Sequence, residues 1–356
     1  MKRLVLPLCA ALLSAGAAAQ SVTMFGLVDL SLSRYEVSGG RKLNTLSHSS
    51  NNLSRLGFRG SEDLGGGLSA SFWLEGALTP DDGNASGFSF MRRSTISLAG
   101  RWGELRLGRD FTPTYLNDGW FDPFNATGVG TSAVVLQRSS SNSRMPFALG
   151  VSANNAAYIR TSNGLGYHLP AGLGGFYGQV QYALHEQTTP GSRQGQYQGA
   201  RLGYREQRLN IALAAGKVKG ANPASAVAPD VTSVNLGASY DFGVLTLMGE
   251  YARDRYVTAT ATFTGSGWLL GLSAPVGPGA IKVSYSRAKI EGAGTPTAQV
   301  MALGYVYDLS KRSALYTSIA RIRNSQGALV AVAPSVAGRI GDASSQGFDL
   351  GIRHQF

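Results

Sequence analysis

The chain ends with the segment FDLGIRHQF at residues 348–356, in which apolar and polar side chains alternate. Successive side chains of a β-strand point to opposite faces, so this period of two predicts a strand with two different faces. The two sets are Phe348, Leu350, Ile352, His354 and Phe356 on one face, and Asp349, Gly351, Arg353 and Gln355 on the other. Such a strand separates an apolar environment from a polar one.

The same alternation recurs along most of the chain. Segments of roughly ten residues show it, and clear examples begin at Phe176, Val234 and Leu245. No segment after the N-terminus offers the ~18 consecutive apolar residues that a membrane-spanning helix needs. The sequence therefore predicts an all-β protein rather than a helical membrane protein.

The connections between these segments fall into two classes that alternate. The tight connections are 62–66, 100–103, 205–208, 241–243 and 275–279. The long connections are 38–53, 79–90, 111–156, 186–196, 218–230, 290–297 and 323–345. Short turns at one end and long loops at the other are typical of an outer-membrane β-barrel, and we count about 16 strands. A large soluble β-sandwich is the alternative, but it needs neither two alternating loop classes nor a polar interior.

The composition agrees with a barrel between lipid and water. Glycine is abundant (47 residues), as are tyrosine (15) and phenylalanine (14), whereas charged residues make up only 15%. A soluble domain usually carries about 25% charged residues. Several aromatic residues lie near predicted strand ends on the apolar face, where they are expected to form girdles at the bilayer interfaces. These residues are Tyr240, Phe242, Tyr251, Tyr305, Tyr307 and Phe356.

The N-terminus has the layout of a secretory signal peptide. A basic start, Lys2-Arg3, precedes an apolar stretch and the small residues 17–19. We therefore expect residues 1–19 to be a cleaved signal peptide and residues 20–356 to form a single barrel domain; an N-terminal anchor helix is the alternative. The one cysteine, Cys9, lies inside this leader, so the mature chain is expected to contain no disulfide and no cysteine metal site.

The chain is basic. Its formal charge is +11, and removing Lys2 and Arg3 leaves +9 for the mature part. Basic charge often indicates a nucleic-acid partner. Here, however, the arginines are spread through strand-like segments and no run of five or more basic residues occurs. A basic channel interior explains this distribution better than nucleic-acid binding does.

Several segments resemble the general porins of Gram-negative bacteria, in particular the trimeric betaproteobacterial porins. They are SVTMFGLVD at 21–29, SRLGFRGSEDLGGGL at 54–68, LGR at 107–109, LGGFYGQ at 173–179 and the terminal Phe356. The resemblance covers the mature chain. It implies a 16-stranded antiparallel barrel, a homotrimer and a third loop folded into the barrel. It also implies an outer-membrane protein, surrounded by lipid and lipopolysaccharide, through which small hydrophilic solutes and ions diffuse, and whose terminal Phe356 is read by the barrel-assembly machinery.

The selectivity of such a channel depends on charges at its narrowest point. The longest connection, 111–156, is the candidate for the inward third loop. The resemblance assigns an acidic stretch of this loop to the constriction, and Asp118 and Asp122 are the expected acids. The alternative is that one or both of them cap local turns, because Asp before Pro commonly forms turns.

Arginines are expected on the opposite wall. The resemblance assigns Arg55, one of Arg92 and Arg93, and Arg160 to the constriction, with Glu75 as a wall carboxylate near them. Arg59 and Arg106 share a face with the small residues 57 and 108, which also points inward. A charged side chain turned toward lipid costs ~2–4 kcal/mol at mid-membrane, so mid-strand arginines favour the interior. Near loops, a solvated rim is the alternative. With several such arginines we predict a preference for anions.

Other classes of function find less support in the sequence. The four histidines, His48, His168, His185 and His354, lie in no hydrolase or metalloprotease motif, so no enzyme is expected. No phosphate loop, dinucleotide fingerprint or calcium loop is present, and no cofactor or metal is implied. The loops show no repeat that would favour an adhesin. A substrate-specific channel remains open as the alternative to general diffusion.

Overall fold

The structure is a computed structural model that describes residues 21–40, 42–83, 88–138, 158–220, 229–259, 261–291, 294–333 and 341–356. The expected signal peptide, residues 1–19, and residues 139–157 of the third loop lie outside the described residues. No helix in the described part is long and apolar enough to cross a membrane.

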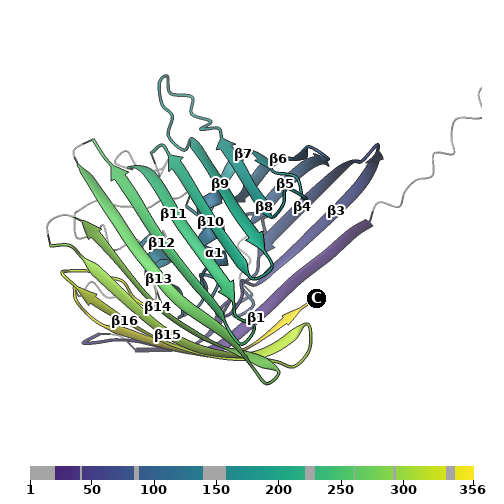
Figure 1. The fold of residues 1–356 in the computed structure, drawn as a ribbon. Coiled ribbons are helices and arrows are strands. Elements are labelled where there is room, and N and C mark those ends of the chain that lie inside the picture. The colour runs from purple at the N-terminus through teal and green to yellow at the C-terminus, as the bar shows by residue number, and fades with distance from the viewer. Residues whose placement is uncertain are drawn as a thin grey trace, which may run out of the picture.

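Strands make up most of the described chain (Figure 1). The strands are β1 (Ser21–Val37), β2 (Lys42–His48), β3 (Arg55–Gly65), β4 (Leu68–Ala77), β5 (Arg93–Gly100), β6 (Gly103–Phe111), β7 (Arg160–His168), β8 (Phe176–Ala183), β9 (Tyr197–Glu206), β10 (Leu209–Val218), β11 (Asp230–Asp241), β12 (Thr246–Val257), β13 (Thr262–Val276), β14 (Gly279–Glu291), β15 (Thr297–Asp308), β16 (Ser313–Ser325) and β17 (Ser345–Gln355). Two helices, α1 (Pro113–Trp120) and α2 (Ala133–Arg138), lie in the connection between β6 and β7.

The strands close into one antiparallel barrel. From β3 onward, each strand pairs with the next, and β17 pairs with β1 over Leu27–Val37. The first part of β1 pairs with β3 and the second part with β2, so β2 and β3 share one position. The seventeen named strands therefore fill sixteen positions, as the sequence predicted. Closure leaves each strand with a hydrogen-bonding neighbour on both sides, which the interior of a bilayer requires.

The expected loop classes are confirmed, with one correction. Tight turns join β3 to β4, β5 to β6 and β9 to β10 at one end of the barrel, and longer connections lie at the other end (Figure 1). We call these ends the short-turn side and the long-loop side. The segment 38–53, expected to be a loop, contains β2, whose residues pair with Leu30–Glu36 of β1. The chain continues as a strand there because β1 extends far enough to offer it free backbone partners.

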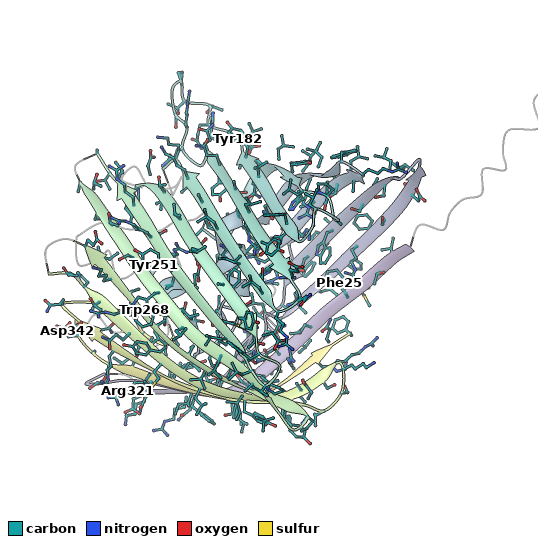
Figure 2. All side chains as sticks on the ribbon, in the orientation of Figure 1. Phe25, Tyr182, Tyr251, Trp268, Arg321 and Asp342 are labelled. Atoms are coloured by element: carbon teal, nitrogen blue, oxygen red, sulfur yellow. The ribbon has the colours of Figure 1, made fainter. Side chains whose placement is uncertain are left out.

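The two faces of the wall differ as the alternation predicts. Large apolar side chains project outward and are exposed in the isolated chain; Tyr251 and Trp268, labelled in Figure 2, are examples. Phe348, Leu350 and Ile352 of β17 are also exposed, whereas Asp349 between them is buried. Of the residues expected in the aromatic girdles, Tyr251 lies in the middle of β12, and the others lie near the short-turn side. An outer surface of this kind suits lipid, and a polar inner surface suits water.

The connection between β6 and β7 folds into the barrel, as expected for the third loop. Helix α1 packs against β8–β11 (Figure 1). Helix α2 packs against β13–β15. Glycines of the inner wall make room for this loop. A Cβ on Gly237 of β11 would lie 1.9 Å from Cδ2 of Phe121, and a Cβ on Gly271 of β13 would lie 2.6 Å from Cγ of Pro123. The loop is therefore seated in a groove that larger wall residues would fill.

Candidate functional site

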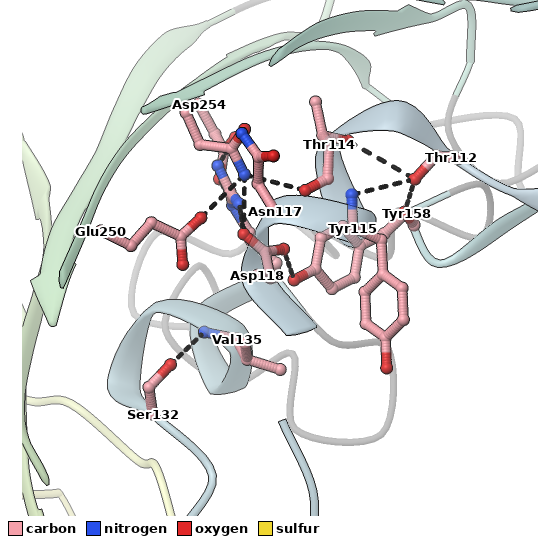
Figure 3. A network of polar contacts seen from close by, with 12 residues as sticks. Thr112, Thr114, Tyr115, Asn117, Asp118, Ser132, Val135, Tyr158, Glu250 and Asp254 are labelled. Atoms are coloured by element: carbon pink, nitrogen blue, oxygen red, sulfur yellow. Dashed lines mark hydrogen bonds and ion pairs between the residues drawn. The ribbon is translucent and has the colours of Figure 1, made fainter. Parts of the chain in front are cut away.

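A buried network fastens the third loop to the barrel wall (Figure 3). Arg138 of α2 donates from Nη1 to Asp118 Oδ1 at 2.8 Å, and from Nε and Nη2 to both carboxylate oxygens of Asp254 on β12 at 2.7 and 2.9 Å. The Tyr158 hydroxyl donates to the other Asp118 oxygen, and Asn235 of β11 donates to Asp118 Oδ1. All five side chains are buried. We call the group Asp118, Arg138, Tyr158 and Asp254 the loop latch.

This arrangement corrects the role expected for the two loop acids. Asp118 is fully buried and ion-paired to Arg138, so it faces the wall rather than an open channel. Asp122 is also buried, and its carboxylate accepts the backbone N–H groups of Phe124 and Ala126 at 2.8 and 3.3 Å. Asp122 thus caps a local turn, which was the alternative that the Asp-Pro sequence left open. Burial raises the pKa of Asp122 to about 6.

An opening of about 450 Å³ lies between α1 and the wall made by β1, β3 and β4. The loop side of this opening carries Tyr115, Leu116, Gly119 and Trp120. The wall side carries four of the charged residues expected from the sequence, Arg55, Arg59, Glu75 and Arg92. Three guanidinium groups and one carboxylate leave a formal surplus of two positive charges among these lining residues.

Arg55 and Arg92 are held in place by their neighbours. Arg55 Nη1 donates to Asn52 Oδ1 at 3.0 Å and to the Leu53 carbonyl at 2.8 Å. Arg92 Nε lies 2.6 Å from Glu75 Oε1, and both side chains are buried. This ion pair brings Arg92 to the inner side although it precedes β5. Arg93 pairs in register with Glu75, so it shares the inner face with this carboxylate. Both Arg92 and Arg93 therefore lie inside the barrel.

Trp73 of β4 lies between two further arginines. The Arg59 guanidinium carbon lies 5.3 Å from the centre of the Trp73 ring, and that of Arg93 lies 4.5 Å from it. Both arginines, with Trp73, also line a second space of about 380 Å³ along the inner wall. Arg59 is exposed, whereas Arg93 lies 3.6 Å from Asp110 and is partly neutralised. A cation over an aromatic face is attracted without losing its charge, so Arg59 keeps its positive charge available.

The two remaining arginines lie inside the barrel but do not line the opening. Arg106 points inward as expected, but it is paired with Glu104 and, at 2.6 Å, with Asp110. Arg160 stacks on Phe111 at 4.2 Å, and it is Phe111 that lines the opening. The structure therefore brings Arg55, Arg59, Glu75 and Arg92 together at the opening, which Arg93, Arg106 and Arg160 do not line.

The structure shows two sets of interior residues that were not predicted from the sequence. The first is the Arg138–Asp254 half of the loop latch, for which the sequence contains no local signal because the residues are 116 positions apart. The second is a pair of arginines on β9, Arg201 and Arg205, that face Trp120 of the loop at 4.1 and 4.7 Å. Here a signal existed: Arg201 alternates with the outward Leu202, which places it on the inner face.

Comparison with known proteins identifies the barrel. The family of Gram-negative porins matches this chain over residues 8–327. The outer membrane porin protein 32 of Delftia acidovorans is 38% identical over the whole of both chains. An outer membrane porin protein of Bordetella pertussis is 30% identical over 98% of this chain and 99% of that one. Among solved structures, an anion-selective porin from Comamonas acidovorans superposes with a TM-score of 0.81, at 38% identity, over 95% of this chain and 100% of its own.

These matches extend over nearly the whole barrel, including the loop that narrows it. The apolar side chains on the outside of the barrel and the polar ones inside agree with these matches. A diffusion channel in the outer membrane needs a lipid-facing exterior and a polar interior. The chain belongs to the Gram-negative porin family and is an outer-membrane channel protein.

Proposed function

We propose that this porin lets small hydrophilic solutes and ions diffuse through its barrel and that it prefers anions. The observation that carries the preference is the surplus of two positive charges among the residues that line the opening. Arginine stays charged at every relevant pH, so the positive charges of this surplus do not depend on protonation. The Comamonas acidovorans porin, which has a similar barrel, is described as anion-selective and supports the same direction.

The positions of the third loop and of the arginines at the opening also suggest how anions pass through the channel. We call the side of the opening that carries Arg55, Arg59 and Arg92 the arginine wall. The loop latch holds α1 at a fixed distance from this wall, and the aromatic neighbours of Arg59 leave its charge unneutralised. A passing anion meets arginines in sequence rather than one deep site. Binding that is weak and distributed over several sites is what conduction requires.

The zero-current potential of a planar bilayer tests this proposal. With purified porin and a tenfold gradient of KCl across the bilayer, we expect a potential of the sign that indicates chloride preference. A potential of the opposite sign, or none, would contradict the anion preference. Measuring the current at rising concentrations of one solute separates the two kinds of channel, because general diffusion stays proportional to concentration whereas a substrate-specific channel saturates.

We further propose that the channel is a homotrimer in a membrane containing lipopolysaccharide. The resemblance to trimeric porins supports the homotrimer. The apolar side chains that cover the outside of the barrel support its place in a membrane. In the same bilayer recordings, closure under high voltage is expected to occur in three equal steps. Insertion events that close in a single step would contradict a trimer of separate pores.

The terminal Phe356 is proposed to be the residue that the barrel-assembly machinery reads. Its backbone exchanges two hydrogen bonds of 3.1 Å with Gly26, so β17 is paired up to its last residue while the ring stays exposed. Replacing Phe356 with Ala is expected to lower the amount of porin in isolated outer membranes several-fold. The control is Phe242→Ala, which removes an exposed ring from an internal turn. Equal amounts of both variants in the outer membrane would refute a special role for the terminus.

A further inference from the structure

Opposite the arginine wall of the opening, a second group of cationic and aromatic side chains surrounds Trp120. Trp120 is the last residue of α1, lines the opening and is 43% exposed. Arg201 and Arg205 of β9 place their guanidinium carbons 4.1 and 4.7 Å from the centre of its ring. Tyr177 of β8 completes the group, with its ring centre 5.7 Å from that of Trp120. We call these four residues the Trp120 cluster.

The wall is shaped to hold this cluster. Tyr177 pairs in register with Gly203, which lies between the two arginines on β9. A Cβ on Gly203 would lie 2.2 Å from Cζ of Tyr177, so the tyrosine ring covers the glycine and is flanked by Arg201 and Arg205. The Tyr177 hydroxyl is fixed by a 2.6 Å hydrogen bond to Asn210. The aromatic ring and the two cations are therefore positioned by the strands themselves.

The charges of the cluster are not neutralised by acids. Arg92, Arg106 and Arg138 each contact a carboxylate. In the described part of the chain, neither Arg201 nor Arg205 forms an ion pair, and their contacts are with aromatic rings, Asn117 and the Tyr177 hydroxyl. Arg201 is buried and uses Nε for Asn117, whereas Arg205 is exposed. Two neighbouring cations beside an exposed indole can thus still take up an anion.

We propose that the Trp120 cluster is a binding site for aromatic carboxylates on their way through the channel. An arginine fork matches the two oxygens of a carboxylate. Aromatic rings bind offset or edge-to-face to other rings, which Trp120 and Tyr177 offer beside the two guanidinium groups. An aliphatic carboxylate can use only the arginines and a neutral aromatic only the rings, so a ligand with both groups binds best. The inference rests on the proposed function, since the ligand reaches the cluster through the open channel.

The test uses 4-nitrobenzoate as the probe in planar-bilayer recordings of the whole porin. We expect it to reduce the chloride current in a concentration-dependent way, whereas acetate and the neutral 4-nitrobenzamide at equal concentration do not. Trp120→Leu is expected to raise the half-blocking concentration about fivefold, through loss of ring contacts. Arg205→Gln is expected to raise it about tenfold, through loss of a charge-assisted hydrogen bond. The matched controls, Trp102→Leu and Arg208→Gln, alter exposed residues in short turns and should leave it unchanged.

Tryptophan fluorescence gives a second readout that does not depend on conduction. The chain has four tryptophans, and a nitroaromatic ring quenches those it touches. In the wild type 4-nitrobenzoate should quench with saturation, and in Trp120→Leu the saturable part should disappear. Equal block and equal quenching in both proteins would overturn the site, and equal block by acetate would overturn the aromatic class. Chloride preference without block by 4-nitrobenzoate would overturn the site and leave the proposed function intact. Block by 4-nitrobenzoate without chloride preference would support the site and contradict the proposed anion preference.

Discussion

Replacing Arg138 with Met is expected to free the third loop from the wall and to raise the single-channel conductance. The substitution leaves Asp118 and Asp254 buried without their cation. Breaking a buried ion pair by removing one partner costs about 3–5 kcal/mol. Because the opening is bounded on one side by α1, a loop that leaves its seat widens the channel. Bilayer recordings measure the conductance, and heat-modifiable migration on a gel confirms that the barrel is still folded.

Two further variants show whether charge or volume causes the effect. Adding Asp118→Asn and Asp254→Asn to Arg138→Met removes both unpaired charges, and this triple variant is expected to recover part of the wild-type conductance. Gly237→Leu acts independently, since its side chain would occupy the space of Phe121 while the loop latch stays intact. Its conductance should also rise. The control is Arg208→Met in the exposed turn between β9 and β10. Wild-type conductance in a folded Arg138→Met barrel would show that the latch does not hold the loop.

Replacing Arg59 with Glu is expected to abolish the preference for anions. Arg59 is exposed, so a carboxylate there stays hydrated, and the formal charge of the lining residues falls from +2 to 0. Two unit charges about 5 Å apart in water interact with an energy of about 0.8 kcal/mol. After screening by salt, the change of two charges should lower the permeability ratio of chloride to potassium about tenfold.

A graded series makes this prediction specific. The double variant Arg59→Glu with Arg55→Gln has a formal lining charge of −1 and should prefer cations. Gln removes the charge of Arg55 and keeps a polar N–H donor at this position. The matched control Arg208→Glu changes the total charge by the same amount outside the opening and should keep the wild-type zero-current potential. Equal shifts in Arg59→Glu and Arg208→Glu would mean that net charge, rather than the opening, sets the selectivity.

The architecture of this porin could be predicted from local sequence. Alternation with a period of two assigns each side chain of a strand such as β17 to lipid or to the interior. The alternation of short and long connections predicts an even, closed set of strands, and the cost of a charge in lipid turns Arg55, Arg59 and Arg106 inward. Each of these conclusions depends only on neighbours in the chain, which is why the sequence suffices.

The tertiary structure decided which side chains face one another across the interior of the barrel. Asp118 and Asp122 were expected at the constriction, but closure of the barrel brings Asp254 of β12 and, through it, Arg138 to Asp118. In the same way, Arg201 and Arg205 meet Trp120 only because α1 lies against β9. A period of two determines the face of a side chain but not its partner across the lumen. The sequence by itself thus determined a basic-walled barrel, and only the folded loop decided which charges remain open to a passing solute.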